Sequence, residues 1–188
     1  MKMILGTLAL VASVGTATAD EFTAALEAFL EAEIVGWAED DRLIEAINAQ
    51  NGQTIGYDQA RIDELDQMWR AEVGQSVTPT ITPVLENPLS AMLRDTVSNS
   101  GGRILEVFVM DARGLNVAAS APTSDYWQGD ESKFTETYGR GAGSSHISEV
   151  EFDESTQSYQ GQISITVVDP GTGDAIGAIT FGVDPLAL

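Results

Sequence analysis

Residues 159–183 read Tyr-Gln-Gly-Gln-Ile-Ser-Ile-Thr-Val-Val-Asp-Pro-Gly-Thr-Gly-Asp-Ala-Ile-Gly-Ala-Ile-Thr-Phe-Gly-Val. The first ten residues alternate in polarity with a period of two, which is typical of a strand with two unlike faces. Residues 169–174 have turn chemistry, and residues 176–183 are again rich in β-branched side chains. The stretch therefore predicts an antiparallel hairpin. Its first strand has one apolar and one polar face: Ile163, Ile165 and Val167 against Gln162, Ser164 and Thr166.

The N-terminus has the pattern of a secretory signal peptide. Lys2 precedes an apolar run over residues 3–14, and Ala17-Thr18-Ala19 forms an Ala-x-Ala cleavage site. The run is shorter than the roughly 18–20 residues that span a membrane, and no later run is long enough. The alternative is an uncleaved anchor. We expect residues 1–19 to be removed and residues 20–188 to be a soluble periplasmic protein.

Composition excludes several classes of protein. The chain has no cysteine, which rules out a disulfide scaffold, thiol catalysis and cysteine metal sites. It carries 9 Lys and Arg against 29 Asp and Glu, a net charge of −20. Such a charge repels nucleic acid and anionic membranes, so we expect neither as a partner. We also expect no cofactor.

The first half of the mature chain has helical periodicity. Residues 20–50 predict one long helix that ends at Asn51-Gly52, and its apolar stripe places Ile34 and Trp37 in the core. Asp58 is the expected N-cap of a second helix, which ends at Gly74. Residues 76–83 are expected to form a loop, and Asn87-Pro88 to begin a third helix.

The second half changes to a period of two. Strands are predicted over residues 104–111, 115–120 and 147–152, with a short helix over residues 130–138, before the terminal hairpin. The fold class is therefore α+β: a helical part over residues 20–102 and a five-stranded, mainly antiparallel sheet over residues 103–188, in one domain.

Three motifs follow one another in the second half. They are Glu106-Val-Phe-Val-Met-Asp111-x-x-Gly114-x-Asn116-Val-Ala-x-Ser120, Ser124-Asp-Tyr-Trp127 and Val168-Asp-Pro-Gly-Thr-Gly173-x-x-Ile176-Gly177-Ala-Ile. In this order and spacing, after a long helix, they resemble a single Cache domain. Cache domains are the PAS-like extracytoplasmic sensor domains of chemoreceptors and histidine kinases.

The resemblance implies a PAS-like sheet with the long helix on one face and a small-ligand pocket under loops on the other. Typical ligands of the family are amino acids, carboxylates and other small metabolites, and for this chain we expect an amino acid, a carboxylate or an amine. Family members usually lie between two membrane helices, whereas this chain resembles a freestanding periplasmic form. Its output is then expected to pass through a separate membrane sensor or transport protein, and the long helix could form a homodimer.

Seven residues are candidates for binding a ligand. Asp125, Tyr126 and Trp127 lie where the family places pocket-closing aromatic residues, and a carboxylate beside two rings could hold an amino or quaternary ammonium group. The alternative is that Trp127 fills the core. The family's usual arginine before the aromatic pair is absent, because Thr123-Ser124 occupies its place. The other four candidates are Lys133 and Arg140 at the pocket rim, for a ligand carboxylate or as ordinary surface charge, and Ser164 and Thr166 below the ligand.

Other polar residues favour less specific interpretations. His146 is the only histidine and cannot build a typical zinc site with cysteine absent. Glu149, Glu151 and Asp153 alternate along one predicted strand face, where they could attract calcium or form a solvated edge. The leading hypothesis is a non-enzymatic sensor module. The alternatives are an exported enzyme with Asp125, His146 or the acidic cluster as general base, and a structural protein that dimerises through its helix.

Export should remove residues 1–19, because the Ala-x-Ala site follows a short apolar run. Mass spectrometry of the exported protein checks this, with an N-terminus at Asp20 as the expected result. Retention of Met1 in the exported protein would contradict it.

Overall fold

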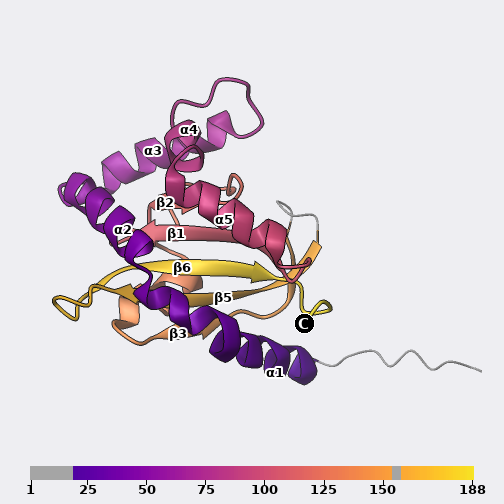
Figure 1. Ribbon diagram of the computed structural model, residues 1–188. Helices are drawn as coiled ribbons and strands as arrows, with labels where there is room; N and C mark the ends of the chain where they lie inside the picture. Colours follow the sequence, from indigo (N-terminus) through magenta and orange to yellow (C-terminus); the bar gives the residue numbers. More distant parts are fainter. Residues whose placement is uncertain (1–18, 154–157) are drawn as a thin grey trace, which may run out of the picture.

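The computed structural model describes residues 19–153 and 158–188. The predicted signal peptide lies outside the described residues, apart from Ala19 at the start of α1. Within the described part, no helix has both the length and the apolar character needed to cross a membrane. Helices pack against both faces of a single twisted sheet (Figure 1).

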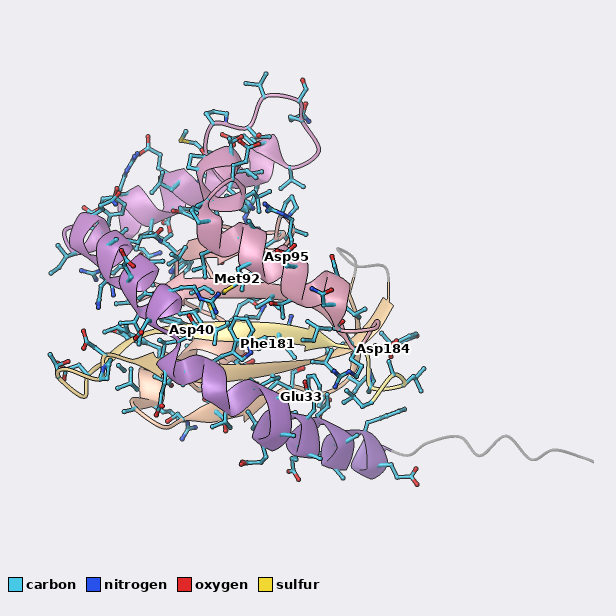
Figure 2. The ribbon with its side chains drawn as sticks, in the orientation of Figure 1. Glu33, Asp40, Met92, Asp95, Phe181 and Asp184 are labelled. Carbon is cyan, nitrogen blue, oxygen red and sulfur yellow. The ribbon has the colours of Figure 1, made fainter. Side chains whose placement is uncertain are left out.

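The N-terminal helical run is interrupted, so the prediction of one continuous helix is wrong. It consists of α1 (Ala19–Phe29), the π-helical η1 (Leu30–Ile34), the 3-10 helix η2 (Val35–Glu39) and α2 (Asp41–Thr54). The break is at Asp40, whose backbone is extended and whose carboxylate accepts a hydrogen bond from the Arg42 amide. This bond caps α2 and lets the chain change direction above the sheet (Figure 2).

The predicted helix end at Asn51-Gly52 is also wrong, because α2 continues to Thr54. The Asn51 side chain is used for tertiary contacts instead. Its Nδ2 donates to the Ile176 carbonyl at 2.8 Å, and its Oδ1 accepts from the Ala112 amide at 2.8 Å. Asn51 therefore joins α2 to the sheet rather than ending the helix.

Three more helices complete the first half: α3 (Gln59–Glu72), α4 (Ile81–Leu85) and α5 (Pro88–Asn99). The predicted caps are confirmed, since Asp58 accepts from the Arg61 amide and Asn87 from the Ser90 amide. Helix α4 was missed, because part of it lies in the segment predicted as a loop. The Glu72 carboxylate accepts hydrogen bonds from the amides of Thr80 and Ile81, which stabilises the start of α4.

The sheet confirms the predicted five-stranded antiparallel fold. Its path is β2-β1-β6-β5-β3, and a short β4 pairs separately with β5. The predicted strand over residues 147–152 is not continuous, because its ends belong to two short strands, β3 and β4. The bounds are β1 (Ile104–Asp111), β2 (Asn116–Ala119), β3 (Ser145–Ile147), β4 (Glu151–Asp153), β5 (Ser158–Val168) and β6 (Ala175–Val183).

The apolar face of the sheet forms the main core with the N-terminal helical run and α5. Ile163, Ile165 and Val167 of β5 lie in this core with Leu26 and Ile34, as the alternation predicted. Trp37 packs edge-on against Phe181 with ring centroids 5.4 Å apart. It is only partly buried, so the prediction of a core position holds for Ile34 and not fully for Trp37.

The other face is covered over part of its area. Helices α6 (Ser132–Thr135) and η3 (Tyr138–Arg140) lie across β5 and β6. Phe134 and Tyr138 form a second, smaller core with apolar side chains of β1, β2 and β6: Phe108, Met110, Ala119 and Ala178.

Replacing Ile34 by alanine should lower the free energy of unfolding by about 2–5 kcal/mol, because the side chain is 1 % exposed. Val35→Ala is the matched control on the neighbouring residue, which is 46 % exposed and should cost about 0.5 kcal/mol or less. Chemical denaturation measures both. Equal losses would mean that the N-terminal helical run does not pack on the sheet.

Candidate ligand-binding site

The loop between β2 and α6 is held in place by α3. The Asp66 carboxylate of α3 accepts hydrogen bonds from the amides of Tyr126 at 2.9 Å and Trp127 at 3.1 Å. The Trp69 indole donates to the Thr123 carbonyl at 2.8 Å. From the sheet, Asn116 Nδ2 donates to Thr123 Oγ1 and to the Asp125 carbonyl. These bonds fix residues 123–127 beside the sheet edge and orient their side chains.

The uncovered part of the polar sheet face forms the floor of a pocket. Gln160 of β5 donates from Nε2 to Glu106 Oε1 of β1 at 2.9 Å, and both residues are buried. Gly182 lies between them, where an added Cβ would be 2.5 Å from Gln160 Oε1 and 2.6 Å from Glu106 Cγ. Within the described residues, Gln160 Oε1 is buried without a hydrogen-bond partner. The floor therefore presents an acceptor that a ligand N–H could satisfy.

The pocket above this floor, called the polar pocket below, has a volume of about 710 Å³, in the range of small-molecule sites. A small extension of about 30 Å³ reaches Glu106 and shares Ser124, Lys133 and Gln162 with it. The walls come from the β2–α6 loop, α6, β3, β4 and β5. The lining residues are Ser124, Asp125, Glu131, Ser132, Lys133, His146, Ile147, Ser148, Glu149, Glu151, Gln160 and Gln162.

Negative charge dominates this pocket. Asp125, Glu131, Glu149 and Glu151 line it together with a single cation, Lys133. The Lys133 ammonium is 2.9 Å from Glu131 Oε2 and lies 5.3 Å from the centre of the Phe108 ring. Burial raises the pKa of Asp125, and the Arg70 guanidinium 3.2 Å away opposes this shift. When Glu131 is counted against Lys133 and Asp125 against Arg70, Glu149 and Glu151 still give the pocket wall an excess of negative charge, which favours a ligand with positive charge.

The structure does not bring the seven predicted ligand residues into one cavity. Asp125 and Lys133 line the polar pocket, whereas Ser164 and Thr166 line neither large pocket of the described chain. Ser164 Oγ and Thr180 Oγ1 hydrogen-bond to each other at 2.9 Å, and both residues are fully buried. The predicted polar face is correct, but α6 and η3 cover this part of it.

The remaining three predicted residues also point elsewhere. The Tyr126 ring stacks on Trp69 and lines a second cavity. Trp127 donates from its indole to the Arg113 carbonyl at 2.9 Å and lies against Gly129. Arg140 is 64 % exposed and pairs with Glu136. Ligand binding by any of the seven residues stays a prediction.

His146, Glu149 and Glu151 line the polar pocket, so the acidic edge faces it rather than bulk solvent alone. Among the residues described, no three His, Asp or Glu side chains are grouped to hold a metal ion. The side chain of Asp153 lies outside the described residues. Glu106 and Gln160 of the pocket floor were not among the residues predicted from the sequence, although a glutamate inside an otherwise apolar strand was a usable signal.

Comparison with known proteins identifies a similar fold but assigns the chain to no family. No family model and no curated protein matches the sequence. The sensor domain of the V. cholerae histidine kinase DctB superposes with a TM-score of 0.52 at 15% identity, over 89% of this chain and 54% of that chain. This chain thus spans about half the length of that domain.

Two further similar structures are ligand-binding domains of the Campylobacter jejuni chemoreceptor Tlp3. One, in complex with 4-methylisoleucine, has a TM-score of 0.42 at 10% identity, covering 79% of this chain and 62% of that chain. The other, in complex with L-valine, has the same TM-score and identity, covering 87% and 63%. The match to DctB shows that this chain has the fold of a histidine kinase sensor domain, which agrees with the PAS-like α+β fold predicted from the sequence.

Replacing Asp66 by alanine should loosen the β2–α6 loop, because two backbone amides lose their acceptor. We expect a loss of about 1–3 kcal/mol in stability and faster hydrogen exchange at the Tyr126 and Trp127 amides. Asp63→Ala, at an exposed position of the same helix, is the control. Unchanged exchange at both amides in Asp66→Ala would show that α3 does not hold the loop.

Proposed function

We propose that this protein is a non-enzymatic extracytoplasmic sensor module that binds a small amine-bearing metabolite in the polar pocket. The observation that carries the proposal is the pocket floor. Among the residues that the structure describes, Gln160 Oε1 has no hydrogen-bond partner, and it is buried beside the Glu106 carboxylate and below four acidic wall residues. A protonated amine donates up to three hydrogen bonds and carries the charge that this arrangement attracts.

The pocket favours an amine over the other ligand classes considered from the sequence. A ligand carboxylate would meet Lys133 alone, and that ammonium is already paired with Glu131 at 2.9 Å. An amino acid could place its ammonium group near the floor, but its carboxylate would lie among acidic walls. A molecule with one or more ammonium groups and no carboxylate matches the charge of the pocket best.

Sensing is favoured over catalysis. A solved structure with a similar fold is the sensor domain of a histidine kinase. We also propose that the protein acts outside the cytoplasm and signals through a separate membrane protein. A homodimer through the N-terminal helical run remains part of this proposal.

A thermal-shift screen of residues 20–188 against small amines, quaternary ammonium compounds and carboxylates tests the proposal. A ligand at 100 times its Kd should add about 2.7 kcal/mol to stability and raise the melting temperature. Only the compounds with an ammonium group are expected to do so. Stabilisation by carboxylates alone would contradict the assigned ligand class.

Asp125→Asn should weaken binding of the best amine about tenfold, because it removes a charge at the pocket wall while keeping the shape of the side chain. Asp95→Asn, at an exposed position of α5, makes the same chemical change away from the pocket and should leave the affinity unchanged. Isothermal calorimetry measures both variants. Equal affinities would place the amine elsewhere on the protein.

A further inference from the structure

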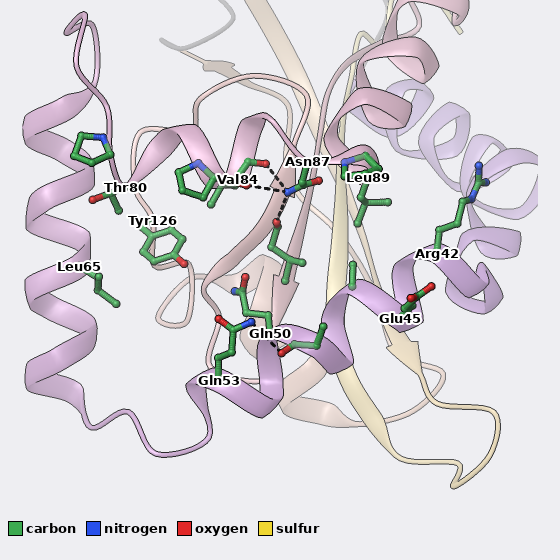
Figure 3. Close-up of a pocket in the computed structure, with 16 residues that line it drawn as sticks. Arg42, Glu45, Gln50, Gln53, Leu65, Thr80, Val84, Asn87, Leu89 and Tyr126 are labelled. Carbon is green, nitrogen blue, oxygen red and sulfur yellow. Dashed lines mark hydrogen bonds between the residues drawn. The ribbon is translucent and has the colours of Figure 1, made fainter.

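A second cavity lies among the helices on the other side of the β2–α6 loop. It has a volume of about 760 Å³ and shares no lining residue with the polar pocket. Its walls come from α2, α3, α4 and α5, with Val117 of β2 and Tyr126 of the loop (Figure 3). Asp125 and Tyr126 are adjacent in the chain, yet they line different cavities. The loop thus separates a polar site from a mainly apolar one.

The lining of the second cavity differs from that of the polar pocket in both polarity and charge. Leu65, Val84 and Leu89 contribute apolar surface from three helices. The two charged residues, Arg42 and Glu45, lie at the end far from Tyr126, and Arg42 is paired with Asp40 at 2.6 Å (Figure 3). A charged ligand would therefore lose its hydration without finding an unpaired counter-charge in the interior of the cavity.

Two polar atoms at the Tyr126 end are available to a ligand. The Gln50 amide nitrogen is committed to Asp111 Oδ2 at 3.0 Å and to two backbone carbonyls, which leaves Oε1 as the acceptor of that side chain. Tyr126 is held by stacking on Trp69, with ring centroids 5.2 Å apart and planes 12° from parallel. Within the described chain, neither the Tyr126 hydroxyl nor Gln50 Oε1 has a hydrogen-bond partner, and burial raises the pKa of the tyrosine.

We infer that this cavity is a second small-molecule site, which takes an uncharged, largely apolar ligand with one hydrogen-bonding group directed at Tyr126 and Gln50. The stacking on Trp69 holds the tyrosine ring in one orientation, so the hydroxyl is positioned before the ligand arrives. Apolar surface on the helices supplies most of the affinity, and the two polar atoms select the orientation of the ligand. The inference does not depend on the amine ligand of the polar pocket.

N-phenyl-1-naphthylamine is a suitable probe, because it is uncharged and apolar, has one N–H donor and fluoresces more strongly in apolar surroundings. Titrated into residues 20–188, it should bind saturably with one molecule per chain. Ala49→Trp places a large side chain on the cavity wall and should weaken binding at least tenfold. Ala71→Trp makes the same change at an exposed position of α3 outside the lining, and should leave the affinity unchanged.

Tyr126→Phe keeps the ring stacked on Trp69 and removes only the hydroxyl, so binding of the probe should weaken about three- to tenfold. Should Ala49→Trp fail to fold, Thr80→Trp obstructs the cavity from the opposite wall. Amine binding, measured on the same tryptophan variants, should be unchanged, so the two proposals fail independently. Unsaturable binding, or equal affinity in a folded Ala49→Trp or Thr80→Trp variant, would show that the dye binds exposed apolar residues such as Ile55 and would overturn the inference.

Discussion

The pairing of β5 with β6 is the interaction on which the rest of the structure depends. It places the last strand of the chain between β5 and β1, so that β6 is hydrogen-bonded on both edges. Residues 176–183 are all buried, and an added Cβ at Gly177 would be 2.2 Å from the Met110 carbonyl oxygen. A central strand with so little space tolerates few changes of register, because a shift of one residue would exchange the two faces of the sheet. The helices pack on faces that this hairpin defines.

The β2–α6 loop turns this scaffold into two separate cavities. Asp66 holds the loop by two backbone amides, and consecutive side chains then point to opposite sides. Asp125 faces a pocket with excess negative charge, and Tyr126 faces a cavity with mainly apolar walls. Because α3 provides both Asp66 and the Trp69 ring that stacks on Tyr126, movement of this helix would change both cavities together.

The alternation of polar and apolar residues in β5 predicts only part of the candidate site. Alternation places Gln162, Ser164 and Thr166 on one face of β5, and the structure confirms a polar face there. It does not indicate which part of that face is open. Phe134 of α6 lies in the second core over this face, and Ser164 pairs with Thr180 instead of a ligand. Gln160 and Gln162, which lie nearer the start of β5, line the polar pocket. Polar side chains on the same face of β5 thus have different surroundings, because the packing of α6, which is distant in the sequence, decides which part of that face is covered.

The sequence by itself determined the fold class, the hairpin, the two sheet faces and the caps at Asp58 and Asn87, because these features depend on residues within a few positions of one another. The helix α4 and the separation of β3 from β4 were decided by tertiary structure, whereas at the break the Asp40 carboxylate accepts a local hydrogen bond from the Arg42 amide. In the helical half, contacts between distant residues, such as Asn51 with Ile176 and Ala112, outweigh local signals for a helix end. The two cavities were also decided by tertiary structure. Their walls join residues from α2 to β5 that are far apart in the chain, and only packing brings them together.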